Sequence, residues 1–184
     1  MTDPLELRDV MSPLKIKITN RNLCLFTVRD LFKKTDRYEF DFDVYLPSKQ
    51  MNLQRDLCWT LFQKQELILS ILKGVDIPPI SVIHRDHSIY YVIDGKQRLH
   101  TVLEFIDNEF PIEVKGNLYY FKDLGDSCLY KFLQFTFLGD VAYEYTDHPD
   151  PVLFSDDDKI QWFALLNFSG TPQDKEHLKA LEGG

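Results

Sequence analysis

The sequence has no apolar run of the roughly 20 residues that a membrane-spanning helix needs. Its N-terminus also lacks the basic-then-apolar order of a secretory signal. Cysteine is scarce, and Cys24, Cys58 and Cys128 show none of the paired spacings of a zinc site or a disulfide framework. No internal repeat is present. These absences argue against a membrane-spanning or disulfide-stapled protein and predict a cytoplasmic one with no membrane contact.

The chain is also poor in positively charged residues, chiefly in its second half. The formal net charge is -8, and residues 101–184 hold 6 Lys and Arg against 16 Asp and Glu, whereas residues 1–100 hold 15 against 13. Tight binding to duplex DNA needs several cations facing phosphates at once, so we expect DNA to be bound only weakly or indirectly. A small phosphate ligand in the first half is compatible with this balance. The acidic half suits a basic surface on a partner protein.

Length and composition favour one domain. With 184 residues, 44% of them hydrophobic, the chain can bury one core but is too short for two domains of ordinary size. We expect a flexible N-terminus over residues 1–12 and a single domain over residues 13–184. An alternating pattern predicts an edge strand over residues 15–19.

The middle of the chain carries the strongest local signals. Thr60 and Gln63 form a capping box that predicts a helix ending at Gly74. The apolar face of this helix is expected to contain Leu61, Ile68, Ile71 and Leu72. Two β-rich runs over residues 80–84 and 89–94 predict a hairpin, and a helical repeat follows until residue 106.

The remaining patterns complete an α/β (α+β) fold with a mixed sheet and additional C-terminal helices. In the first third they predict a helix over residues 27–36 and a strand and loop over 40–49. Further along they predict strands around a turn within 112–121, a helix over 126–137 and a strand over 141–146. Near the C-terminus they predict a helix that begins with the acidic residues 156–158, a polar turn over 167–172 and a last helix to residue 181.

The passage from strand to helix at Asp94 and Gly95 is typical of a phosphate-binding turn. A helix N-terminus offers unpaired N–H groups and about half a positive charge, and Lys96 and Arg98 add cations. Asp94 is suited to hold Mg²⁺, and Gln97 to orient a water molecule. A second interpretation needs no ligand: Asp94 caps the helix in an ordinary turn, with the cations in solvent.

A family resemblance favours the first interpretation. It rests on four segments that occur in order: Gln54-Arg55 with Trp59, Leu67 to Gly74 leading to Ile77-Pro78-Pro79-Ile80, Tyr91-Val92-Ile93 followed by Asp94-Gly95-Lys96-Gln97-Arg98, and Asn167 to Pro172. The five-residue motif resembles the Asp-Gly-Gln-Gln-Arg signature of the GmrSD restriction endonuclease N-terminal domain family. The resemblance spans roughly residues 40–175 of the chain.

The resemblance implies a ParB/sulfiredoxin-like core whose strand–helix turn binds and hydrolyses nucleoside triphosphate (NTP). It also implies a restriction system aimed at modified phage DNA, in a bacterial or phage-infected cell. Catalytic roles are expected for Asp94, Gln97 and Arg98, with Asp94 as the Mg²⁺ ligand. Nucleotide contacts are expected from Gly95, Lys96, Gln54, Arg55, Asn167, Ser169 and Thr171.

Two of these contact segments have simpler interpretations. Arg55 is equally typical of a surface arginine stacked on Trp59. The loop that contains Asn167, Ser169 and Thr171 is also typical of an ordinary helix end that binds nothing.

The sequence departs from the family pattern at Lys96, which replaces the first Gln. The change adds a cation but removes an amide that would position water, so binding is the firmer expectation and Mg²⁺-dependent hydrolysis stays open. No His-Asn-His cluster is present, so we expect any DNA cleavage to come from a partner nuclease or from this fold. Two alternatives follow: a catalytically silent regulator or inhibitor of a larger nuclease, and a ParB-like nuclease that acts directly on DNA. The direct nuclease would need a basic stripe formed by Lys15, Lys17, Lys33, Lys34 and Arg37.

Overall fold

A five-stranded mixed sheet forms the centre of the protein in a computed structural model, which describes residues 16–33, 39–86 and 89–168. The strand order is β1 (Asn20–Thr27), β9 (Thr136–Glu144), β5 (Ile80–Arg85), β6 (Ile89–Asp94) and β2 (Glu39–Asp41). The pairs β1–β9 and β5–β6 are antiparallel, whereas β5–β9 and β6–β2 are parallel. This sheet confirms the predicted α/β class with mixed strand directions. The ParB/sulfiredoxin-like arrangement stays a prediction.

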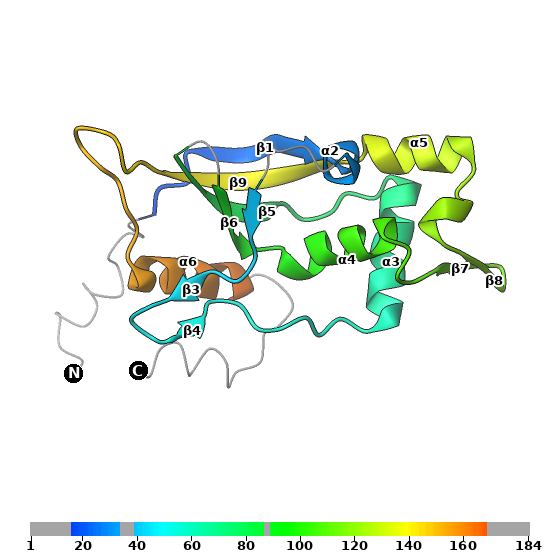
Figure 1. The fold of residues 1–184 in the computed structure, drawn as a ribbon, viewed down its shortest axis with the longest axis horizontal. Coiled ribbons are helices and arrows are strands. Elements are labelled where there is room, and N and C mark those ends of the chain that lie inside the picture. Colours follow the sequence, from blue (N-terminus) through cyan, green and yellow to red (C-terminus); the bar gives the residue numbers. More distant parts are fainter. Residues whose placement is uncertain (1–15, 34–38, 87–88, 169–184) are drawn as a thin grey trace, which may run out of the picture.

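Helices cover both faces of the sheet. On one side lie α2 (Val28–Phe32), α3 (Leu61–Lys73), α4 (Lys96–Ile106) and α5 (Asp126–Gln134), and α6 (Asp156–Phe168) lies apart from them (Figure 1). Strand residues alternate between the two sides, so that Val92 joins the core of the first group and Ile93 joins Trp162 and Phe163 of α6. The site described below lies where β6 meets α4.

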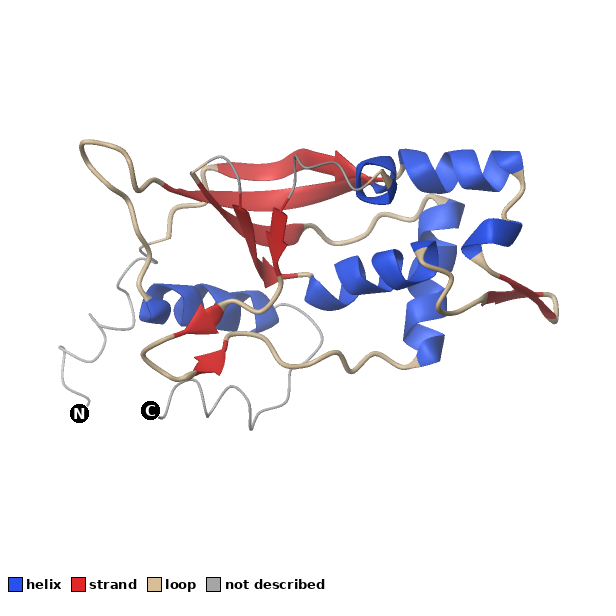
Figure 2. Ribbon diagram, viewed as in Figure 1, coloured by secondary structure: helices blue, strands red, loops and turns tan. Residues whose placement is uncertain are grey.

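Two small hairpins and a 3-10 helix complete the described residues. The first hairpin, β3 (Tyr45–Leu46) with β4 (Met51–Asn52), packs with α6 through Leu46. The second, β7 (Ile112–Val114) with β8 (Asn117–Tyr119), lies at the far end of the molecule near η1 (Phe121–Asp123) (Figure 2). No helix in the described ranges is long and apolar enough to cross a bilayer.

Local signals placed several element ends correctly. The hydroxyl of Thr60 accepts a hydrogen bond from the Gln63 N–H, and the Gln63 side chain accepts one from the Thr60 N–H, which is the predicted capping box. The helix ends at Gly74, whose φ of 73° suits glycine. The hairpin of β5 and β6, the helix after Gly95 and the acidic start of α6 are likewise confirmed.

Other element boundaries that the sequence predicted were wrong. The strand predicted over residues 15–19 begins instead at Asn20, and the helix predicted over residues 126–137 ends at Gln134. Residues 136–144 form one long strand, because the aromatic residues there pair with β1 rather than continuing the helix. Leu61, expected on the apolar face of α3, is exposed. The predicted flexible residues 1–12 and the last helix lie outside the described residues.

Candidate functional site

Gly95 connects β6 to α4 in a conformation that only glycine adopts without strain. Its φ is 111°, and a Cβ at this position would lie 2.5 Å from the Ile80 Cγ2 atom. Gly95 is buried, so the reason for glycine is close packing against β5. No side chain caps the first turn of α4, so its free N–H groups have no side-chain acceptor among the described residues.

Arg98 ties this turn to the segment that precedes β5. Its Nη2 lies 2.5 Å from the Asp94 carboxylate, and its Nη1 donates to the carbonyl oxygens of Pro78 and Pro79. The Arg98 side chain is only 12% exposed and that of Asp94 is 34% exposed. Burial lowers the pKa of Arg98, an effect opposed by Asp94, and an arginine remains charged despite such a shift. The alternative that Asp94 caps α4 was wrong, because Gly95 occupies the N-cap position.

Gln97 fastens the loop before α3 to the same turn. Its Oε1 accepts hydrogen bonds from the backbone N–H groups of Cys58 and Trp59, at 3.1 and 3.3 Å. Its Nε2 donates to the Asp56 carbonyl oxygen at 3.0 Å. Because the amide is committed to this loop, Gln97 has a clear positioning role. Its predicted role in orienting water stays a prediction.

Arg55 lies between two of these anchors. Gln54 is buried and donates its Nε2 to the Val92 carbonyl oxygen, and Asp56 is held by Gln97. The backbone at Arg55 is therefore fixed beside the end of β6 and the start of α4. Its buried Nε has no hydrogen-bond partner among the described residues. A buried N–H without an acceptor is costly, so a group of this kind commonly donates to a bound water molecule or ion.

Lys96 is the buried member of an asymmetric ion pair. Its Nζ lies 2.5 Å from the Asp43 Oδ1, and the Lys96 side chain is 6% exposed whereas the Asp43 side chain is 66% exposed. Asp43 belongs to the segment between β2 and β3, so this contact attaches the sheet edge to α4. The sequence had not pointed to Asp43, because the partners are 53 residues apart.

One helical turn further along α4, His100 lies against Phe42, with 4.5 Å between the ring centroids. Burial lowers the pKa of His100, and Lys96 lowers it further, while Glu104 and Asp43 act in the opposite direction. His100 and Asp43 line a pocket of about 380 Å³ at the edge strand β2. A lone histidine inside a helical pattern gives no sequence signal for such a pocket.

Of the three contacts predicted near the C-terminus, only Asn167 lies within the described residues. Asn167 lies inside the last turn of α6, where its Nδ2 donates to the Phe163 carbonyl oxygen at 2.7 Å. The prediction that the turn begins at Asn167 was therefore wrong. Ser169 and Thr171 lie outside the described residues.

The described residues contain no cluster of three His, Cys, Asp or Glu side chains that could hold a metal ion. Mg²⁺ usually binds through one or two carboxylates together with water and substrate phosphates. A single carboxylate such as Asp94 fits that pattern only if a nucleotide supplies the other oxygens.

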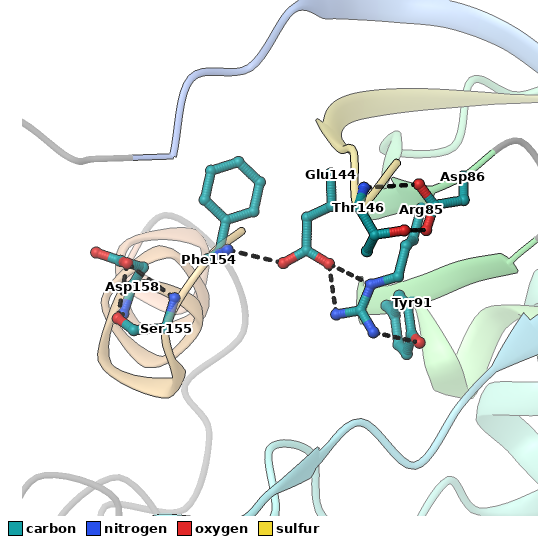
Figure 3. Close-up of polar contacts among 8 residues, drawn as sticks. All are labelled: Arg85, Asp86, Tyr91, Glu144, Thr146, Phe154, Ser155 and Asp158. Carbon is teal, nitrogen blue, oxygen red and sulfur yellow. Dashed lines mark hydrogen bonds and ion pairs between the residues drawn. The ribbon is translucent and has the colours of Figure 1, made fainter. Parts of the chain in front are cut away.

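A second buried charge pair lies away from the turn. Glu144 of β9 is fully buried, and its Oε2 lies 2.6 Å from Nη2 of Arg85 and accepts a second bond from Arg85 Nε (Figure 3). Arg85 also donates from Nη1 to the Tyr91 hydroxyl, and the Phe154 N–H donates to the other Glu144 oxygen. This network joins β5, β6 and β9 to the segment that leads into α6.

The fold and the site define an α/β domain in which a strand, a glycine turn and a helix are fixed by charged and amide side chains. The profile of the GmrSD restriction endonuclease N-terminal domain matches residues 28–181, and the chain belongs to that family. No curated protein and no solved structure gives a significant match. The family confirms the predicted resemblance and places the chain among the domains of restriction systems, which defend cells against phages.

Proposed function

We propose that this domain binds a nucleoside triphosphate, as its Mg²⁺ complex, at the turn between β6 and α4. The observation that carries the proposal is the buried Arg55 Nε, which has no acceptor among the described residues although its neighbours fix it beside the turn. A phosphate oxygen would supply that acceptor, because guanidinium and phosphate match in geometry and charge. The uncapped N–H groups of α4 would bind the same anion.

The other motif residues divide into positioning and binding roles in this proposal. Arg98 and Gln97 brace the turn through contacts to Pro78, Pro79 and the loop before α3, so their side chains are mostly occupied. Asp94 is the group that would contact Mg²⁺ through its partly exposed carboxylate. Lys96 would reach phosphate only by leaving Asp43.

A binding experiment tests the proposal. Isothermal titration with Mg²⁺ and each common NTP should give saturable binding in the wild-type protein. Arg55→Ala should weaken it at least tenfold, because a charged hydrogen bond in a shielded site contributes about 1.5–3 kcal/mol. Arg21→Ala, at an exposed arginine of β1, is the matched control and should bind like the wild type. Absence of binding by every NTP, or full binding by Arg55→Ala, would refute the proposal.

The second candidate function is a silent regulator that binds NTP without turnover. It is favoured by the contact between Lys96 and Asp43, which places an ion pair where the family signature has an amide. A single-turnover assay separates the two: release of phosphate in a Mg²⁺-dependent manner shows an NTPase, and a stable complex without phosphate release over hours shows a regulator. Direct DNA cleavage has less support, since the formal net charge of -8 disfavours tight binding to DNA. Lys15, Lys34 and Arg37 of the expected basic stripe lie outside the described residues.

A further inference from the structure

Lys96 is a buried cation at the first position of α4. It directly follows Gly95, so it lies at the same helix end as the uncapped N–H groups of the proposed phosphate site. Its side chain is 6% exposed, and its Nζ lies 2.5 Å from the Asp43 Oδ1. An ammonium group carries three N–H donors, and Asp43 is the only hydrogen-bond acceptor for Lys96 among the residues that the structure describes. The other donors of Lys96 remain for a ligand, in a place where a buried charge needs partners.

Asp43 holds this cation from the solvent side. Its side chain is 66% exposed, so its carboxylate stays largely hydrated while it contacts Lys96. Separation of the pair costs Asp43 little, because water replaces Lys96 as its partner, whereas Lys96 is left buried without a counter-ion. A phosphate oxygen supplies that counter-ion, since ammonium and phosphate form charge-assisted hydrogen bonds. The asymmetry of burial makes Asp43 the partner that is readily exchanged.

The backbone around Asp43 is fixed, so the exchange needs only a side-chain rotation. The Asp43 N–H donates to the Asp41 Oδ1 at 2.9 Å, and the Val44 carbonyl oxygen accepts a hydrogen bond from the Leu53 N–H at 2.8 Å. Val44 and Leu53 both belong to the buried core that packs on α6. Leu53 lies two residues before Arg55, so this hydrogen bond joins the Asp43 segment to the segment that carries the other proposed phosphate contact.

A second lysine pair on α4 provides the contrast. The Lys64 Nζ also lies 2.5 Å from its partner, the Glu104 Oε2, but the two side chains are shielded to a similar degree, at 23% and 18% exposed. Neither partner of that pair is released to solvent at small cost. Glu104 lies about two helical turns beyond Lys96, away from the helix N-terminus. The Lys64–Glu104 pair is therefore a matched control for the Lys96–Asp43 pair.

We propose that Asp43 is an autoinhibitory acceptor, which occupies Lys96 until the phosphates of a nucleotide replace it; the inference rests on the proposed function. In the unliganded domain Asp43 neutralises Lys96. When the Mg²⁺ complex of NTP binds at the turn, a phosphate oxygen accepts the hydrogen bond from the Lys96 Nζ and the Asp43 side chain turns to solvent. The exchange weakens nucleotide binding by the cost of separating the pair, so Asp43 sets the NTP concentration at which the domain responds.

Isothermal titration of the full chain with Mg²⁺ and NTP tests the exchange. Asp43→Asn should bind NTP about threefold tighter than the wild type, because a neutral amide competes poorly with phosphate for Lys96. Glu104→Gln breaks the Lys64 pair in the same way and should bind like the wild type. Weaker or unchanged binding by Asp43→Asn would overturn the proposal.

A double mutant separates this exchange from the general effect of removing a negative charge near an anion site. Lys96→Met fills the buried space without a charge, and the exposed Asp43 stays hydrated. In the Lys96→Met background, the further change Asp43→Asn should leave NTP affinity unchanged, because the coupling between the two positions is gone. An equal gain in affinity with and without Lys96 would show that Asp43 acts by long-range repulsion, which also overturns the proposal.

The ¹⁵N resonance of the Lys96 Nζ reports the exchange directly and needs only the wild type. It should move when Mg²⁺ and NTP are added, and inorganic tripolyphosphate, which has no base, should move it in the same direction. If NTP binds and this resonance stays unchanged, the exchange is wrong and the NTP site stands. If NTP binds neither the wild type nor Asp43→Asn, the proposed function and the exchange both fail.

Discussion

Two arginine–carboxylate pairs in this domain differ in which partner is buried. In the first, the Glu144 side chain is 0% exposed and Arg85 reaches it from a partly exposed position. In the second, Arg98 is the more buried partner, with 12% of its side chain exposed, and Asp94 is partly exposed at 34%. The first pair closes the join between β5, β9 and the segment before α6. The second fixes a turn, leaves its acidic group partly exposed and leaves the first N–H groups of α4 without a side-chain cap.

This difference in burial suggests different roles: the Arg85–Glu144 pair stabilises the fold, and the Arg98–Asp94 pair positions the proposed binding turn. The Glu144 carboxylate is buried and both of its oxygens accept hydrogen bonds from the protein, so loss of its partner arginine should lower stability. The side chains around Gly95 hold the turn in place while the first N–H groups of α4 stay uncapped, which is the arrangement that the proposed anion site requires. The following predictions test that contrast, beginning with the largest effect.

Arg85→Met should cause the largest loss of stability. It leaves the Glu144 carboxylate buried without its cation, which costs about 3–5 kcal/mol of unfolding free energy. Urea unfolding followed by circular dichroism measures this loss. Arg21→Met removes the same charge from an exposed position and should cost less than about 0.5 kcal/mol. Equal losses of unfolding free energy in the two variants would show that the Glu144 network does not stabilise the fold.

Gly95→Ala should cost about 2–4 kcal/mol, because strain at positive φ adds to a clash of the new methyl with Ile80. Gly74→Ala has the same kind of φ, at +73°, but nothing lies within 4 Å of its new Cβ. It should cost only about 1 kcal/mol. The difference between the two unfolding free energies measures the packing of the turn on β5. No difference would contradict the close contact.

Gln97→Ala should cost about 1–2 kcal/mol and should act locally, since it removes three hydrogen bonds to the loop before α3. Hydrogen exchange should accelerate at the Cys58 and Trp59 amides and stay unchanged in β9. Gln134→Ala, at an exposed position of α5, is the control. Unchanged protection of Cys58 and Trp59 in Gln97→Ala would show that Gln97 does not hold the loop.

The smallest effect concerns pH. The pKa of His100 is lower in the folded protein than its usual value of about 6.5, so the unfolded chain binds more protons between the two values. Stability should therefore fall as pH decreases through that window. His100→Gln should remove this part of the pH dependence of Tm, whereas His148→Gln at an exposed position should not. Identical pH profiles for wild type and His100→Gln would contradict the assignment.

The parts of the fold that follow from neighbouring residues were predictable. The capping box of Thr60 and Gln63, the β5–β6 hairpin and the strand–turn–helix at Gly95 all depend on spacings of a few residues. The end of α5 could not be predicted from the sequence, because the aromatic residues near 135–137 fit a helix and a strand equally well. Pairing with β1 decides for the strand.

The site was only partly predictable for a related reason. The motif identified the turn, but the partner of Lys96 is 53 residues away and that of Arg85 is 59 residues away. Contacts of this kind depend on which distant segments pair in the fold, and this pairing cannot be predicted from patterns among neighbouring residues. The sequence named Arg98 and Gln97 as catalytic residues, which stays a prediction, but it did not indicate that both side chains also hold the turn to Pro78, Pro79 and the loop before α3.

The most direct measurement follows the Nε–H of Arg55 by ¹⁵N NMR during titration with Mg²⁺ and NTP. The account predicts that this resonance shifts downfield and becomes protected from exchange as the N–H gains a phosphate acceptor, while the Arg21 resonance does not move. An Arg55 resonance that stays unchanged when NTP saturates the protein would contradict the central claim.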